Sequence, residues 1–134
     1  MKTYFDHEKL QAYQEALRFY AWCEDLLERV PKTLSVHNQL ERARTSVVLN
    51  IPEGNGKFTG PDRCRFFDNA RGSALECAAC LDLLSIKKHL SDAELDAGKS
   101  SLKAIVSMLV GLIKSNSNDR LFEEPAPYRV GVAE

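Results

Sequence analysis

The sequence predicts an all-α protein, an antiparallel up-down-up-down four-helix bundle. Four segments carry apolar residues three or four positions apart, and short connections marked by Pro or Gly separate them. We find no stretch in which apolar and polar residues alternate as they do in a strand. Because amphipathic helices with short connections bury their apolar stripes against one another, we place the bundle at residues 1–116 and an irregular tail at residues 117–134.

The first two predicted helices are bounded by proline. The first runs from about Asp6 to Val30 and stops before Pro31. Its apolar stripe consists of Leu10, Tyr13, Leu17, Tyr20 and Leu27. The second runs over about residues 36–51, and its stripe consists of Leu40, Ala43, Val47 and Ile51.

The last two predicted helices have clear start signals. Gly60-Pro61 opens the third, which continues to about His89, because proline suits the first turn of a helix. Ser91 with Glu94 three positions later forms a capping-box pattern at the start of the fourth, which ends near residue 115. The two stripes are Phe66, Ala70, Ala74, Cys77, Leu81 and Leu84, and then Leu95, Leu102, Ile105, Leu109 and Leu112.

Composition is that of an ordinary globular domain. The chain has 134 residues, 44% apolar and 28% charged, with a net charge of −1, which argues against a surface coated in positive charge. No run of 18 apolar residues predicts a membrane span, and the N-terminus lacks the apolar core of a signal peptide. We therefore expect a cytoplasmic protein whose four cysteines are free thiols.

Two predicted helices have a second apolar face. On the third helix this face combines Gly72 with Leu75, Ala79, Leu83 and Ile86. On the first helix it comprises Ala12, Phe19, Trp22 and Leu26. Because one small bundle cannot cover all of these from within, we predict a homo-oligomer. The alternative is that the tail, with Leu121, Phe122 and Tyr128, covers one patch.

A polar stripe accompanies the second and third helices. Its members are Arg42, Ser46, Asn50 and Glu53, together with Ser73 and Glu76 on the next helix. One interpretation is a ligand pocket, and the other, which we favour, is a structural hydrogen-bond network between the two helices. Gly54 and Gly56 are expected to let the chain reverse beside it, since glycine accepts left-handed backbone.

The spacing of chemically reactive residues predicts no enzyme. A di-iron centre needs Glu-x-x-His pairs, which do not occur in the sequence, and no glycine-rich phosphate loop follows a strand. Cys77-Ala-Ala-Cys80 has the spacing of two metal ligands, but it lies inside a predicted helix, where buried thiols are usual. We expect no metal and no cofactor. A small-molecule- or metal-binding bundle that uses the polar stripe or the cysteines is the alternative.

Basic residues concentrate between positions 38 and 72. Six basic and four acidic residues give this segment a charge of +2. The candidates for contact with nucleic acid are Arg44, Lys57, Arg63, Arg65 and Arg71. The plainer interpretation is a solvated helix end on which Asp62 and Asp68 are local partners.

Two stretches, QLERARTSVVLNIPEG and RFFDNARGSALE, resemble the signature of the four-helix-bundle family of the 23S rRNA intervening-sequence protein. Glu41 and Pro52 depart from that signature, which commonly has Arg and Ala there. The matching positions are Gln39, Leu40, Arg42, Ala43, Ser46, Asn50, Ile51, Glu53, Gly54, Ala70, Gly72, Ser73 and Glu76.

The resemblance implies a pentameric ring of bundles. The family is also similar in fold to the accessory protein of diversity-generating retroelements, a basic pentameric bundle that binds nucleic acid and reverse transcriptase. We therefore expect a homo-oligomeric, pentameric scaffold that associates with RNA or DNA, or with a nucleic-acid-processing protein.

Overall fold

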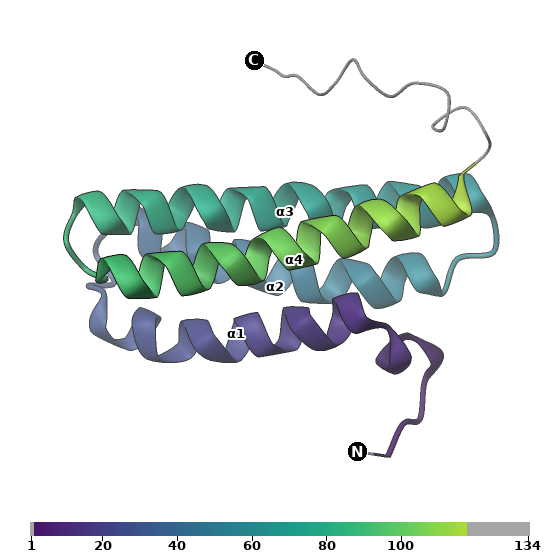
Figure 1. Ribbon diagram of the computed structural model, residues 1–134, viewed down its shortest axis with the longest axis horizontal. Coiled ribbons are helices and arrows are strands. Elements are labelled where there is room, and N and C mark those ends of the chain that lie inside the picture. Colours follow the sequence, from purple (N-terminus) through teal and green to yellow (C-terminus); the bar gives the residue numbers. More distant parts are fainter. Residues whose placement is uncertain (1, 118–134) are drawn as a thin grey trace.

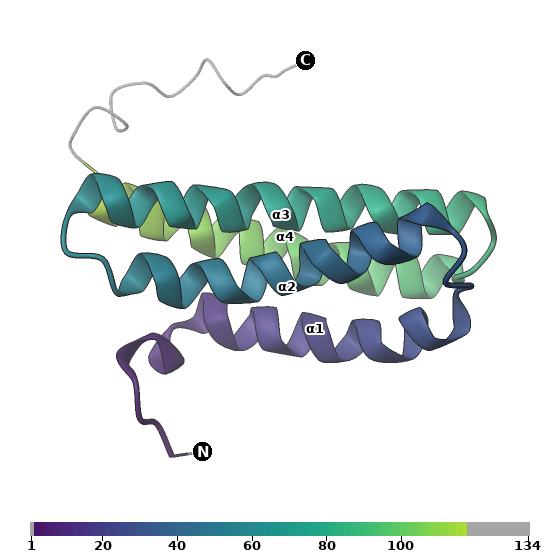
Figure 2. The ribbon, with the colours of Figure 1, turned by 180° about the vertical axis from the view of Figure 1, so that it is seen from behind.

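The computed structural model describes residues 2–117, and in them the predicted four-helix bundle is confirmed. The helices lie side by side and alternate in direction, as Figures 1 and 2 show from opposite sides. Each of α1 and α3 packs against both α2 and α4, so the helices follow chain order around the bundle. The elements are η1 (Asp6–Lys9), α1 (Gln11–Arg29), α2 (Ser35–Asn55), α3 (Gly60–Ile86) and α4 (Asp92–Asn116).

The two ends of the bundle carry different segments. The α1–α2 and α3–α4 connections lie at one end (Figure 1). At the other end, the α2–α3 connection lies near the N-terminal segment and the last turn of α4 (Figure 2). Among residues 2–117, no helix has the length and apolarity needed to cross a membrane. Apart from Ser117, the tail predicted at residues 117–134, including Leu121, Phe122 and Tyr128, falls outside the described residues.

Helix boundaries differ from the sequence prediction at two places. The first predicted helix is divided by Leu10, whose extended backbone (φ −75°, ψ 130°) separates η1 from α1. The second was expected to end near Ile51 but continues through Pro52 to Asn55. Proline removes one helical hydrogen bond, yet Ile51 and Gly54 on either side of it are buried against the rest of the bundle. Tertiary packing therefore overrides the local stop signal.

The start signals of α3 and α4 are confirmed. The hydroxyl of Thr59 accepts a hydrogen bond from the Asp62 amide at 3.3 Å, with proline in the first turn of α3. Ser91 and Glu94 form both bonds of the capping box, at 2.8 and 3.1 Å. These bonds satisfy backbone donors that the first helical turn leaves unpaired. The helices therefore begin where local chemistry directs them to begin.

The core face of α1 is rotated from the one predicted, although Leu27 of the predicted stripe is buried, and Leu10, Tyr13 and Tyr20 are partly buried against the core. Phe19 and Leu26 are buried in the bundle, whereas Leu17 is 39% exposed. Ala12 and Ala16 are buried on the same face. Trp22, which is partly buried, packs against this core. Phe19 and Leu26 were therefore wrong as candidates for an oligomer interface, whereas the candidacy of the partly buried Trp22 stays a prediction.

Candidate assembly and nucleic-acid surfaces

The outer face of α3 presents an apolar strip, which we define as Gly72, Leu75, Ala79, Leu83 and Ile86. All five residues are exposed, with 49% exposure for Leu75, 47% for Leu83 and 76% for Ile86. The strip runs for about 21 Å along the helix, at 1.5 Å per residue. The prediction of a second apolar face on the third helix is therefore confirmed, although what covers it is a separate question.

Charged residues border the apolar strip in an ordered way. Asp68, Glu76 and Asp82 are exposed on α3 beside it. Next to the strip, a groove of about 230 Å³ between α3 and α4 has an apolar floor and two lysines, Lys99 and Lys103, on its α4 side. Leu75, Ala78, Leu102 and Val106 form that floor. The apolar surface thus extends onto α4, and Lys99 at its edge pairs across the two helices with Asp82 of α3 at 2.7 Å.

The predicted polar network exists in a smaller form. The Ser73 hydroxyl donates to the Ser46 hydroxyl at 2.7 Å, and the Asn50 amide donates to the hydroxyl and carbonyl oxygens of Ser46, each at 2.9 Å. These three residues connect α2 to α3. No side-chain N or O atom buried within residues 2–117 lacks a partner, so the connection is satisfied internally.

The other three predicted members do not join that network. Glu53 is exposed and lies 3.7 Å from the Lys57 ammonium. Arg42 and Glu76 are exposed, and within residues 2–117 neither makes a side-chain hydrogen bond or an ion pair. They extend from the helix surface toward solvent rather than toward the opposite helix. Helix periodicity placed Arg42 and Glu76 at the boundary of the apolar stripe, but in the structure both side chains are exposed.

Arg44 links α1 to α2 through buried contacts. Its prediction as a residue that contacts nucleic acid is therefore wrong. The residue is only 4% exposed. Its guanidinium contacts Glu41 and Glu24, each at 2.6 Å, and donates to the Tyr20 carbonyl at 2.8 Å. It also lies 3.7 Å from the centroid of the Tyr20 ring. These contacts occupy the guanidinium inside the protein, so it is not available to a phosphate.

Arg63 also has a structural role. Its guanidinium donates to the carbonyl oxygens of Asn55 and Lys57, at 2.7 and 3.1 Å, and to the side chain of Asn116 at 2.8 Å. It thereby fastens the α2–α3 connection to the end of α4. Most of the five N–H donors of the side chain are used in this way.

Three basic candidates remain accessible. Arg71 is paired with Asp68 at 2.9 Å on the side of α3. Arg65 and Lys57 lie at the α2–α3 connection and make looser pairs, at 3.4 Å to Asp62 and 3.7 Å to Glu53. Exposed pairs of this kind are weak and exchange readily with other anions. The accessible positive charge is therefore smaller than the sequence indicated.

An aromatic residue that sequence reasoning missed lies at the same connection. Phe58 is 101% exposed between α2 and α3. Phe66, which is partly buried, has the Lys57 ammonium 5.0 Å and the Arg65 guanidinium 4.6 Å from its ring centroid. The signal in the sequence was an apolar aromatic between Lys57 and Thr59, in a segment that otherwise reads as a polar loop. We call Lys57, Phe58, Arg65 and Phe66 the basic-aromatic tip.

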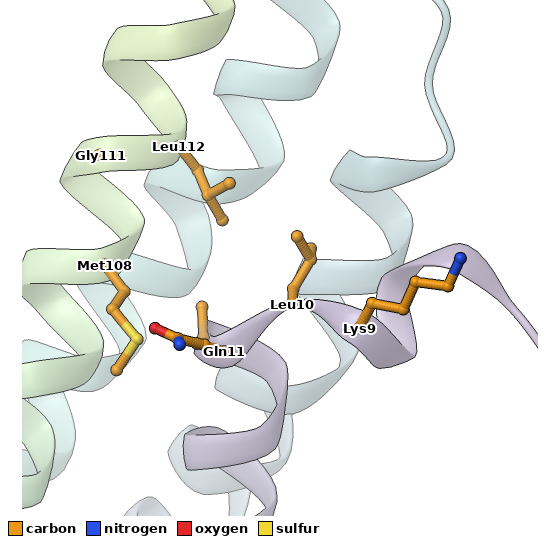
Figure 3. Close-up of a pocket in the computed structure, with 7 residues that line it drawn as sticks. Lys9, Leu10, Gln11, Met108, Gly111 and Leu112 are labelled. Carbon is orange, nitrogen blue, oxygen red and sulfur yellow. The ribbon is translucent and has the colours of Figure 1, made fainter. Parts of the chain in front are cut away.

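The hollows on the surface contain few converging polar groups. One groove of about 290 Å³ lies between the start of α1 and α4, where Leu10 faces Met108 and Leu112 (Figure 3). Lys9 points away from it, so this groove is apolar (Figure 3). A larger hollow of about 780 Å³ lies between the N-terminal segment and α1. In its wall, the Glu8 carboxylate accepts a hydrogen bond from the Tyr4 amide at 2.8 Å, and the Gln14 side chain donates to the Glu8 backbone carbonyl at 3.0 Å.

The cysteines are thiols in protected positions. Cys23, Cys77 and Cys80 are buried, and Cys64, partly buried, donates to the Ile113 carbonyl at 3.4 Å. Burial raises the pKa of Cys23 to about 12 and that of Cys80 to about 11, and it raises the pKa of Cys77 as well. These groups are therefore protonated at neutral pH. Within residues 2–117, no three or more His, Cys, Asp or Glu side chains are grouped so that they could hold a metal ion.

Fold and surface together define a helical bundle with an apolar outer strip and a basic-aromatic tip. Comparison with known families then places it: residues 8–111 match the model of the 23S rRNA-intervening sequence protein family, and the chain belongs to that family. The resemblance carried by the second and third helices is confirmed.

One solved structure supports the same fold. It is a crystal structure of a protein of unknown function from the S23 ribosomal protein family of Bacteroides thetaiotaomicron. It is 21% identical to this chain with a TM-score of 0.72, and the match covers 77% of this chain and 98% of that one. At this identity the likeness shows the fold alone. No match was found among curated proteins.

Proposed function

We propose that this protein is a non-enzymatic scaffold that assembles from several copies of itself and associates with nucleic acid. The observation that carries the assembly is the apolar strip of α3. Large apolar side chains exposed in a continuous row are a mark of an interface, because a monomer gains nothing by displaying them to water. Fully burying one Leu or Ile side chain contributes about 1.5–3 kcal/mol, so covering Leu75, Leu83 and Ile86 is a substantial driving force.

Charge indicates how the copies meet. If two α3 strips faced each other, the Glu76 carboxylates of both copies would be brought together, which is unfavourable because Glu76, unlike Asp68 and Asp82, has no ion pair within residues 2–117. The α4 side of the surface carries Lys99, which pairs with Asp82 of its own chain at 2.7 Å, and Lys103, which has no ion pair within residues 2–117. Packing α3 of one copy on the α4 side of the next brings Glu76 toward Lys103, which puts opposite charges together. Such a head-to-tail contact forms a ring when the rotation between copies closes and an open filament when it does not; we propose the closed form, the pentamer that the family resemblance implies.

Sedimentation velocity tests the assembly. The wild-type protein is expected to sediment as an oligomer, and Leu83→Glu combined with Ile86→Glu is expected to sediment as a monomer with unchanged helix content. Leu49→Glu is the matched control, because Leu49 is an apolar residue of α2 that is 60% exposed and lies outside the strip. A wild-type protein that stays monomeric at all concentrations would refute the proposed assembly.

Nucleic-acid association is supported by the residues that the fold leaves available. Lys57 and Arg65 lie together at the basic-aromatic tip, and a ring would repeat them once per subunit. The test is binding of structured RNA and duplex DNA over a salt titration, since the release of counterions makes such binding weaken with salt. Absence of binding to either at low salt would leave a protein partner as the ligand of the scaffold.

A further inference from the structure

We propose that Phe58 is a stacking platform for unpaired nucleobases, with Lys57 and Arg65 contacting the adjacent phosphates. This inference rests on the proposed association with nucleic acid and specifies its ligand, a single-stranded segment. The reasoning begins with Phe58 itself, which contributes no burial to the fold because its side chain is 101% exposed.

The backbone around Phe58 is held firmly. The Gly56 amide donates to the Pro52 carbonyl at 3.0 Å, and the Lys57 amide donates to the Gly54 carbonyl at 3.2 Å. On the same segment, Arg63 donates to the Lys57 carbonyl at 3.1 Å. A fixed turn therefore displays an aromatic ring whose open face meets solvent. An aromatic side chain loses little rotational freedom when a flat partner stacks on it.

Phe66 brings two cations together at the connection that carries Phe58. The Lys57 ammonium and the Arg65 guanidinium both lie near the Phe66 ring, at 5.0 and 4.6 Å from its centroid. The partly buried ring thus gathers two cations from either side of Phe58 in the sequence. Their acidic partners, Glu53 and Asp62, are exposed and only loosely paired. A phosphate can replace them without leaving a buried charge unpaired.

The combination of two cations and an open aromatic ring favours single strands over duplexes. Stacking on an aromatic side chain needs a free base face, which unpaired nucleotides offer and the interior of a duplex does not. Two phosphate contacts predict a shallow salt dependence: for one single-stranded site, the logarithm of the association constant should fall with the logarithm of the salt concentration with a slope of about −1.4.

The test compares a labelled single-stranded RNA of mixed sequence with a hairpin of the same composition. Phe58→Ala is expected to weaken single-strand binding between about fivefold and about 150-fold, the range for losing one stacked base, and to leave the salt slope unchanged. Phe58→Tyr is expected to retain binding. Replacing both Lys57 and Arg65 by Gln is expected to flatten the slope. Leu49→Ala is the control for loss of an exposed apolar residue nearby.

Each other result overturns the inference in a distinguishable way. If the wild-type protein binds neither RNA, the proposed nucleic-acid association itself fails. If it binds both RNAs and Phe58→Ala binds as well as wild type, the association stands and stacking is refuted. If Phe58→Ala instead dissociates the oligomer in sedimentation, Phe58 anchors a second copy of the chain. Because Phe58 is exposed, each variant is expected to fold, and circular dichroism checks this.

Discussion

Arg44→Ala offers a direct test of the tie between α1 and α2. The substitution removes a charge-assisted hydrogen bond to the Tyr20 carbonyl, and such bonds contribute about 1.5–3 kcal/mol. It also removes a cation–π contact with the Tyr20 ring, which overlaps with that hydrogen bond. Glu24 and Glu41 are 56% and 42% exposed, so water can solvate them, and each lost ion pair costs about 0–1 kcal/mol.

These contributions sum to a loss of about 1.5–5 kcal/mol in the free energy of unfolding. For a domain of this size, that corresponds to a fall of roughly 10 °C in the melting temperature. Thermal unfolding followed by circular dichroism, at one fixed protomer concentration, measures it. Arg44→Met is expected to lose less, because it keeps the apolar part of the buried side chain.

Arg71→Ala is the matched control, since Arg71 belongs to an exposed pair with Asp68 and its loss costs about 0–1 kcal/mol. The structural role of Arg44 would be refuted if the melting temperatures of Arg44→Ala and Arg71→Ala differed by less than about 2 °C, which the same scaling of stability to melting temperature equates with a negligible difference. Loss of nucleic-acid binding in a fully folded Arg44→Ala protein would also contradict it.

Two further predictions concern the helices. Gly54→Ala is expected to destabilise the fold by about 1–3 kcal/mol, because its Cβ would lie 2.9 Å from the Phe67 ring and 3.0 Å from the Arg63 carbonyl. Gly111→Ala is the control and is expected to stabilise the fold slightly, because its Cβ would meet nothing within 4 Å. Equal melting temperatures for the two variants would contradict this packing argument. The Ser91 amide and then Arg29 lower the pKa of Glu94 from 4.5, so the contribution of the Glu94 carboxylate to stability is present above that pH and is lost as the pH falls through the folded-state pKa. The difference in unfolding free energy between wild type and Glu94→Gln should therefore shrink on acidification. A difference that stays constant with pH would count against this role of Glu94.

The sequence came close to the fold because its signals were local. The capping box at Ser91 and the proline after Gly60 act within the first turn of their helices, so the residues alone predict where α3 and α4 begin. The second apolar face of α3 followed from helical periodicity in the same way. For α1, periodicity was ambiguous, because two apolar arcs compete, and only the fit of Phe19 among its neighbours decided between them.

The glycine of the signature shows where sequence reasoning went wrong about a cause. Gly54 was expected to supply left-handed backbone, but no glycine within residues 2–117 has positive φ. It lies inside α2 and is buried where α3 approaches, so what it provides is the absence of a side chain. Spacing along one chain reports local conformation and does not report the distance between two helices.

What the sequence by itself determined is the set of four helices, the starts of α3 and α4 and the apolar strip of α3, since each follows from residues within a few turns of one another. Which basic residues remain accessible was decided only by the tertiary structure. Arg44, Arg63 and Arg65 look alike in sequence, but the first is enclosed between α1 and α2, and the second is bonded to Asn55 and Asn116. The difference arises because the partners of a long side chain are chosen by the helices packed beside it, and these come from distant parts of the chain.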